Sequence, residues 1–209
     1  MAAIATEVAI HHRLPPEEAA RGDFYALLAR LLHDAPEAAL LRTLAEAEPI
    51  PADGEAALAK AWQDLVHASA AMDADAARDE YEALFAGVGK SAVSIYAGFY
   101  SGATAVEHPR VRILDDMSAL GLAPRAHVTE PEDHFAALFD VMRVLAAGGA
   151  GRSAAKLADQ RRFFESHVQP GAMKFFDALG RAGPANYYRK VAALGAAFIS
   201  LETESFVLE

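Results

Sequence analysis

Apolar side chains recur every three or four residues along most of the chain, which is the spacing of one face of an α-helix. Two clear stripes of this kind are formed by Phe24, Leu27, Leu28, Leu31 and Leu32, and by Leu58, Trp62, Leu65 and Val66. No stretch shows the sustained alternation with β-branched residues that is typical of strands. The pattern therefore predicts an all-α protein without a sheet.

Prolines and glycines divide these stripes at the places where helices usually begin and end. Pro36 and Pro131 are expected in the first turns of helices, and the Gly148-Gly149 pair is expected to end the helix that follows Pro131. A last helix is expected from about Pro184 to Leu201. We predict a single helical bundle over residues 1–209, in which residues 1–14 form a candidate flexible N-terminus.

The charge of the chain limits the classes of partner. The formal net charge is −10, from 29 acidic and 19 basic residues. This balance argues against binding to nucleic acid or to an anionic membrane surface, and it favours cationic partners. The chain has no cysteine, which excludes disulfides, thiolate zinc sites, iron–sulfur clusters and a cysteine nucleophile.

The sequence predicts a cytoplasmic protein that does not insert into a membrane. The N-terminal segment, residues 1–12, has no cationic start, and Glu7 interrupts its apolar run, so it does not resemble a secretory signal. The longest uncharged stretch, residues 91–106, is shorter than the roughly 20 residues that span a bilayer. The absence of cysteine also fits a reducing compartment.

The first candidate motif is an amphipathic segment, Glu80 to Ala86, that runs into Gly87-Val88-Gly89 and is followed by Ser94-Ile95-Tyr96. Glycines at this spacing are typical of a helix C-cap. A phosphate-binding loop is the alternative, although Lys90-Ser91 lies too close to Gly89 for the Walker spacing. Nucleotide binding therefore stays open as a weaker interpretation.

The second candidate motif is Glu130-Pro131-Glu132-Asp133-His134, at the expected start of a helix. Acids in a first turn favour the positive end of the helix dipole, so Asp133 or Glu130 is expected to cap the helix. Capping does not explain His134, because a cationic imidazole is disfavoured at that end. An imidazole beside a carboxylate also offers a donor and an acceptor to a bound peptide.

Other chemistry has weaker support. A helical di-iron site needs two Glu-x-x-His pairs and two further glutamates, and the nearest spacing is Asp64-x-x-His67. The chain contains no Gly-x-Ser-x-Gly elbow for a serine nucleophile. Three aromatic pairs stand in expected helices, and in each we expect one ring in the core and one facing a groove or solvent. These pairs are Phe163-Phe164, Phe175-Phe176 and Tyr187-Tyr188.

Taken in order, the motifs resemble the TorD/DmsD family of redox-enzyme maturation chaperones, within the NarJ-like superfamily. The resemblance rests on Tyr81-x-x-Leu84-Phe85, Gly87-x-Gly89, Ser94-Ile95-Tyr96 and Glu130-Pro131-x-Asp133-His134. It extends to Arg21-x-x-Phe24-Tyr25-x-x-Leu28 near the N-terminus and to Phe163–His167 and Tyr187-Tyr188 near the C-terminus. The chain departs from the family pattern at Val88, at Ser91-Ala92 and at the inserted Glu132.

This resemblance implies a cytoplasmic chaperone rather than an enzyme. Such a protein binds the twin-arginine signal peptide, the apo form, or both, of a molybdopterin-containing oxidoreductase precursor. It assists cofactor insertion and prevents premature export, without a cofactor or metal of its own, as a monomer or a helix-swapped dimer. The implied client-binding residues are Asp133 and His134, then Glu130 and Pro131, with Tyr25, Tyr81, Phe85, Ser94 and Tyr96 as weaker assignments.

Independent chemistry agrees with this hypothesis, because paired carboxylate oxygens suit the arginines of a leader and apolar helix faces suit its hydrophobic run. Two alternatives stay open. One is a helical metal-binding protein or enzyme that uses His134 and nearby carboxylates. The other is a structural subunit that remains in a permanent complex with the finished enzyme.

Overall fold

The structure is a computed structural model that describes residues 16–51, 55–86, 91–102, 109–124, 131–149 and 151–208. Every element in these ranges is helical, and extended backbone pairs only at isolated bridges. The all-α prediction is therefore confirmed. The helices are α1 (Pro16–His33), α2 (Ala38–Ala45), α3 (Ala56–Ala71), α4 (Ala74–Tyr81), η1 (Glu82–Ala86), α5 (Ala97–Tyr100), α6 (Pro109–Ala119), α7 (Phe135–Ala147), α8 (Leu157–Phe163), η2 (Phe164–Val168), α9 (Gln169–Arg181) and α10 (Tyr187–Leu208), where η marks a π-helical turn.

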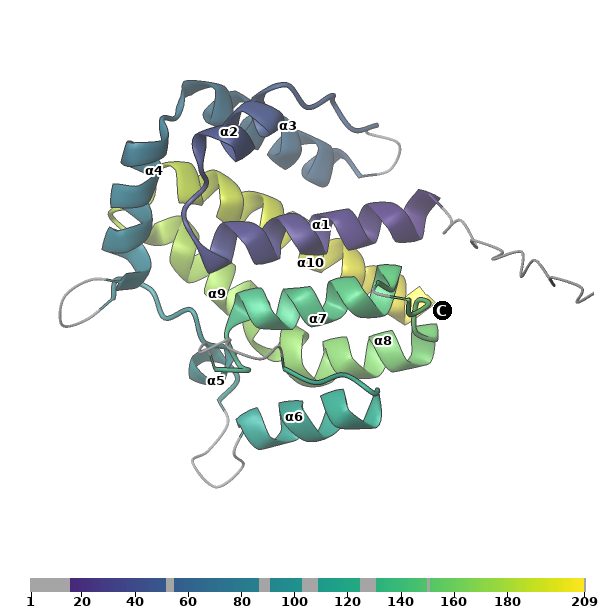
Figure 1. The fold of residues 1–209 in the computed structure, drawn as a ribbon. Coiled ribbons are helices and arrows are strands. Elements are labelled where there is room, and N and C mark those ends of the chain that lie inside the picture. Colours follow the sequence, from purple (N-terminus) through teal and green to yellow (C-terminus); the bar gives the residue numbers. More distant parts are fainter. Residues whose placement is uncertain are drawn as a thin grey trace, which may run out of the picture.

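Helices α1 and α7 lie side by side and make the most extensive helix pair (Figure 1). Small residues let their backbones approach closely. A Cβ built on Gly22 would lie only 2.7 Å from the Cβ of Ala147, so no side chain fits at this position without movement. The candidate site lies along this closely packed pair of helices.

Helices α9 and α10 pack against each other, and α10 also contacts α3 and α1. Helix α10 is long and apolar enough to cross a membrane by length and composition alone, a property that it shares with the core helices of soluble proteins. Its side chains at Val191, Leu194, Phe198 and Ile199 belong to one hydrophobic cluster with residues from α1, α7 and α9. In this structure α10 is a core helix.

The expectation for the paired aromatic residues is wrong. In all three pairs both rings are buried, with at most 1% of any of these residues exposed. Adjacent residues on a helix point about 100° apart, so both can be covered only when neighbours enclose the helix on more than one side. The segments that carry the pairs, from α8 to α10, therefore place both rings of each pair in the hydrophobic core, although other positions of α8 are exposed.

A carboxylate from a distant helix caps the start of α10. Glu80, near the end of α4, accepts backbone N–H bonds from Asn186 and Tyr188 at Oε1, at 2.8 and 2.7 Å, and from Tyr187 at Oε2, at 3.0 Å. The first N–H groups of a helix have no partner within the helix, and they lie at its positive end. Glu80 satisfies three of them and joins two segments that are about a hundred positions apart in the sequence.

We expect Glu80→Ala to lower the free energy of unfolding by about 2 kcal/mol, because charged hydrogen bonds of this kind contribute roughly 1.5–3 kcal/mol. Glu82→Ala, which removes an exposed acid two residues away, is the matched control. Urea unfolding followed by circular dichroism measures both variants. Equal stability of the two would contradict the capping role.

Candidate functional site

Two backbone hydrogen bonds bring the two sequence motifs together. The N–H of Ala97 donates to the carbonyl oxygen of Asp133 at 2.7 Å, and the N–H of Phe135 donates to the carbonyl oxygen of Ile95 at 3.1 Å. Tyr96 and His134 face each other in this antiparallel bridge, and their rings meet edge to face with centroids 5.6 Å apart. The segment 94–97 is thereby fixed against the start of α7.

His134 caps α7, and this finding corrects the expected helix start. The helix begins at Phe135, so Pro131 lies in the turn before it and not in its first turn. The Nδ1 atom of His134 accepts the N–H of Ala136 at 3.1 Å, which requires an unprotonated Nδ1 and therefore fits the positive end of the helix. The expectation that Asp133 caps the helix is wrong, because Asp133 is engaged elsewhere.

The carboxylate of Asp133 is paired with an arginine of the same chain. Nε of Arg110, in the first turn of α6, lies 2.8 Å from Oδ1 of Asp133. Only 8% of the Asp133 side chain is exposed, whereas 54% of the Arg110 side chain is. The predicted acid of the client site is thus a nearly buried carboxylate that already binds a guanidinium group at its outer side.

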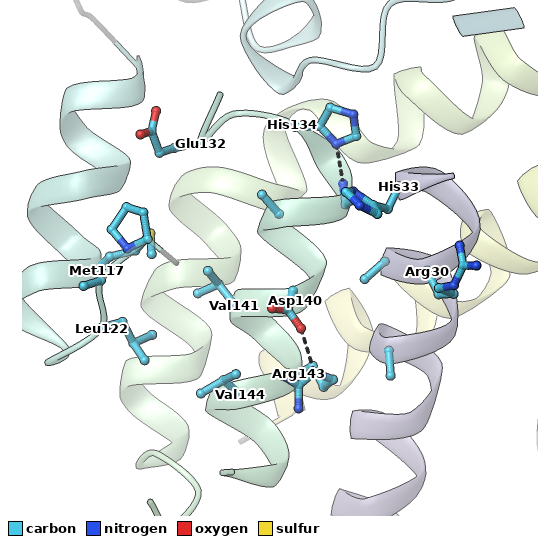
Figure 2. Close-up of a pocket in the computed structure, with 16 residues that line it drawn as sticks. Arg30, His33, Met117, Leu122, Glu132, His134, Asp140, Val141, Arg143 and Val144 are labelled. Atoms are coloured by element: carbon cyan, nitrogen blue, oxygen red, sulfur yellow. Dashed lines mark hydrogen bonds and ion pairs between the residues drawn. The ribbon is translucent and has the colours of Figure 1, made fainter. Parts of the chain in front are cut away.

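A groove of about 440 Å³ lies between α1, α7 and the segment from α6 to Pro124. Most of its lining is apolar, from Ala26, Ala29, Met117, Leu122, Ala123, Pro124, Ala136, Ala137, Val141 and Val144. Figure 2 shows Glu132 and His134 near one end of the groove and Val144 and Arg143 near the other. The groove therefore has a polar end formed by the second sequence motif and an apolar floor that follows α7.

The charged residues around the groove are not equally available. Arg143 pairs with Asp140 at 2.7 Å, and Arg30 makes a longer contact of 3.5 Å with Glu37. Glu132 is half-buried, and within the described ranges no cation pairs with it. Glu132 is therefore the carboxylate in the groove that is best placed to receive an arginine from outside, as the sequence had suggested for Glu130, Glu132 and Asp133 together.

Helix α6 forms one wall of the groove, and three polar contacts tie it to the rest of the bundle. Its start is held by Arg110 and Asp133, and the carbonyl oxygens of Leu120 and Gly121, just after its end, accept from Arg152. In between, Oδ2 of Asp116 lies 2.7 Å from Nε2 of the buried His167. Burial lowers the pKa of His167 below its ordinary value of 6.5, while the hydrogen bond and the charge of Asp116 act in the opposite direction.

Several other predicted site residues serve the core. Tyr25 is fully buried, and its hydroxyl donates to Oε2 of Glu202 at 2.7 Å. Burial, and then the charge of Glu202, raise the pKa of Tyr25 well above its ordinary value, so the hydroxyl stays a donor. The hydroxyl of Tyr81 donates to the carbonyl oxygen of His33 at 2.9 Å, and the rings of Tyr81 and Phe85 pack with their centroids 5.0 Å apart.

The remaining predicted residues that the structure describes lie in the bridge or next to it. Tyr96 is 38% exposed, and Ser94 is half-buried, with its carbonyl oxygen accepting from the hydroxyl of Tyr100 at 2.8 Å. Pro131 is half-buried in the turn before His134. Glu130 and the glycines at 87 and 89 lie outside the described residues, so the nucleotide-loop interpretation stays untested there. A client-binding role for all these residues remains a prediction.

Sequence reasoning missed Arg110 and most of the groove. Arg110 follows Pro109 in a first helical turn, where a cation is unfavourable, and this misplaced charge was a usable signal for an acidic partner. The alanines along α7 gave no comparable signal, because small residues suit any helix. Among the described residues, no three histidine, aspartate or glutamate side chains lie close enough together to hold a metal ion.

Comparisons with known proteins agree with the architecture. A family model described as the nitrate reductase delta subunit matches residues 51–177. A crystal structure from Archaeoglobus fulgidus, described as a redox enzyme maturation protein, shares the fold with a TM-score of 0.52 and 16% sequence identity, over 88% of this chain and 93% of that chain. No curated protein matches. The family match confirms the resemblance that the motifs predicted, and the solved structure agrees in fold.

We expect the imidazole of His167 to titrate below 6.5 in the folded protein. The unfolded state then binds more protons at mildly acidic pH, so the folded state loses stability as the pH falls below about 6.5. Asp116→Asn should lower the pKa of His167 further, because it removes the charge that opposes the effect of burial. NMR titration, with His167→Gln to assign the signal, measures this. Titration of His167 above 6.5 would contradict the analysis.

We expect His134→Ala to lower the free energy of unfolding by about 1 kcal/mol, the usual cost of losing an N-cap, and His134→Asn to cost less because asparagine also caps helices. Chemical unfolding of the two variants beside the native chain tests this. If His134→Asn were less stable than His134→Ala, the edge-to-face contact of the imidazole with Tyr96 would be the stabilising contact instead.

Proposed function

Because this chain belongs to the nitrate reductase delta subunit family, we propose that it is a maturation chaperone for a molybdenum-cofactor oxidoreductase. It binds the twin-arginine leader of the precursor in the cytoplasm, holds the precursor while the cofactor is inserted, and then releases it. The chain works as a single helical domain by recognition and not by catalysis.

The observation that carries this proposal is the groove between α1, α6 and α7. It combines an apolar floor with a carboxylate and an imidazole at one end, from Glu132 and His134. A twin-arginine leader has the same order of properties, with a cationic pair followed by an apolar run. The match also predicts the direction in which the leader lies in the groove. In the reverse direction, its arginines would lie against Val144 and Arg143.

The size of the groove supports a short segment as the ligand. From Ala136 to Val144, both of which line the groove, helix α7 advances about 12 Å at 1.5 Å per residue. An extended peptide covers this distance with about four residues and a helical peptide with about eight. The groove therefore accommodates part of a leader's hydrophobic run, and contacts with the body of the precursor would lie outside it.

Electrostatics add to recognition at a distance. With a net charge of −10, the chain attracts a cationic leader before contact is made. At contact, the carboxylate of Glu132 offers paired oxygens to one guanidinium group. The apolar floor disfavours charged peptides that lack a hydrophobic run. The polar end and the apolar floor of the groove therefore select for different properties of the same segment.

We expect Ala137→Trp to reduce capture of the precursor at least tenfold, because an indole at this half-buried position fills the floor of the groove. Ala193→Trp, at an exposed position inside α10, is the matched control and should capture the precursor normally. The measurement is a tagged pull-down from the native cytoplasm with mass spectrometry of the bound proteins, after thermal unfolding has shown that both variants are folded.

Recovery of a molybdoenzyme precursor by the native chain and by Ala193→Trp, but not by Ala137→Trp, supports both function and site. Equal recovery by all three keeps the chaperone function and removes the groove as the site. Recovery of the mature enzyme in a stable complex with the native chain would replace the proposal by that of a permanent subunit.

A further inference from the structure

The fixed carboxylate of Asp133 is built as a binding site for a guanidinium group. Its backbone is held by the bond from Ala97, and the turn before it is closed by a bond of 3.0 Å from the His134 N–H to the Pro131 carbonyl oxygen. A Cβ built on Gly98 would lie 3.0 Å from Oδ2, which is a tight contact, so glycine at this position leaves room for the carboxylate. Within the described ranges, Oδ2 accepts no hydrogen bond.

Arg110 binds this carboxylate through a contact that another guanidinium group can displace. Its Nε donates to Oδ1 of Asp133. The two terminal N–H groups of the guanidinium therefore do not bind the two carboxylate oxygens as a pair. More than half of the Arg110 side chain is exposed, so its guanidinium group can return to water, whereas the nearly buried Asp133 carboxylate needs another cation in its place. The position of Arg110 in the first turn of α6 is also unfavourable, because the positive end of the helix repels a cation.

We propose that Arg110 is an internal competitor for the client, which an arginine side chain of the bound leader displaces from Asp133. The inference rests on the proposed function. An incoming arginine that uses its fork on both oxygens forms the stronger, bidentate pair. Glu132 lines the groove, and the next residue, Asp133, faces Arg110 outside it. Two neighbouring arginines of an extended leader also point to opposite sides, so each has a carboxylate to bind.

Displacement of Arg110 also acts on the groove. The ion pair ties the start of α6 to the start of α7, and α6 carries Met117, which lines the groove opposite α7. When the leader takes Asp133, this tie is lost while the ties at Asp116 and Arg152 remain. The start of α6, which lies near the polar end of the groove, then becomes free to move as the apolar run of the leader enters. Arginine binding is thereby coupled to the widening of the groove.

The test is the affinity of Arg110→Met for a synthetic peptide, measured by fluorescence anisotropy. The fluorescein-labelled peptide carries an Arg-Arg pair followed by an apolar run, and a second peptide has Lys-Lys in place of Arg-Arg. Arg112→Met is the matched control, because it removes the same charge from an exposed position two residues further along α6. The two variants therefore have the same net charge, and circular dichroism checks that both are folded.

We expect Arg110→Met to bind the Arg-Arg peptide about fivefold more tightly than Arg112→Met does, because no internal guanidinium group then competes for Asp133. The gain should be smaller with the Lys-Lys peptide, because an ammonium group cannot form the bidentate pair. Equal or weaker binding by Arg110→Met, or the same gain with both peptides, would overturn the competition while leaving the chaperone function intact. If neither the native chain nor any variant binds the Arg-Arg peptide, the proposed function fails and the inference fails with it.

Discussion

The two backbone hydrogen bonds between residues 95–97 and 133–135 determine the arrangement of the site. They fix the peptide units on both sides of His134 before any side chain is considered. In an extended bridge, consecutive side chains point to opposite sides. Asp133 accordingly meets Arg110 outside the groove, whereas His134 lines the groove and caps α7. If this bridge were lost, the start of α7, the tie to α6 and the polar end of the groove would change together.

Many of the charged and polar groups near the site have an internal partner. Glu80 caps α10, and Glu202 receives Arg21 through two hydrogen bonds and Tyr25 through a third. The buried carboxylate of Glu202 and the half-buried one of Glu80 are tolerated because each has several donors. The surface that remains for a partner consists mainly of small and apolar side chains with Glu132 at one end. Recognition in this chain therefore depends more on the shape of the groove than on a dense cluster of charges.

The sequence predicted the helices because their apolar spacing is a local signal, but it placed two helix starts too early, since Pro36 and Pro131 lie before the first helical residues, Ala38 and Phe135. It also placed Asp133, His134, Ser94 and Tyr96 in related motifs, and the bridge brings these segments together. It could not predict which donor group each acidic side chain binds. The partner of Asp133 lies 23 positions away and that of Glu80 more than a hundred, and such pairings arise only when helices pack. The aromatic pairs were misjudged for the same reason, since exposure depends on neighbours from elsewhere in the chain.

The contact between Gly98 and Asp133 also has a consequence for how such a chain can diverge. Glycine at position 98 is favoured while a carboxylate stands at position 133, because a Cβ there would crowd Oδ2 at 3.0 Å. A lineage that exchanged the acid for a smaller residue would lose that preference and could accept alanine at 98. One that kept the acid would have to move the carboxylate by a few tenths of an ångström. The two positions should therefore be inherited as a pair, although 35 positions of sequence separate them.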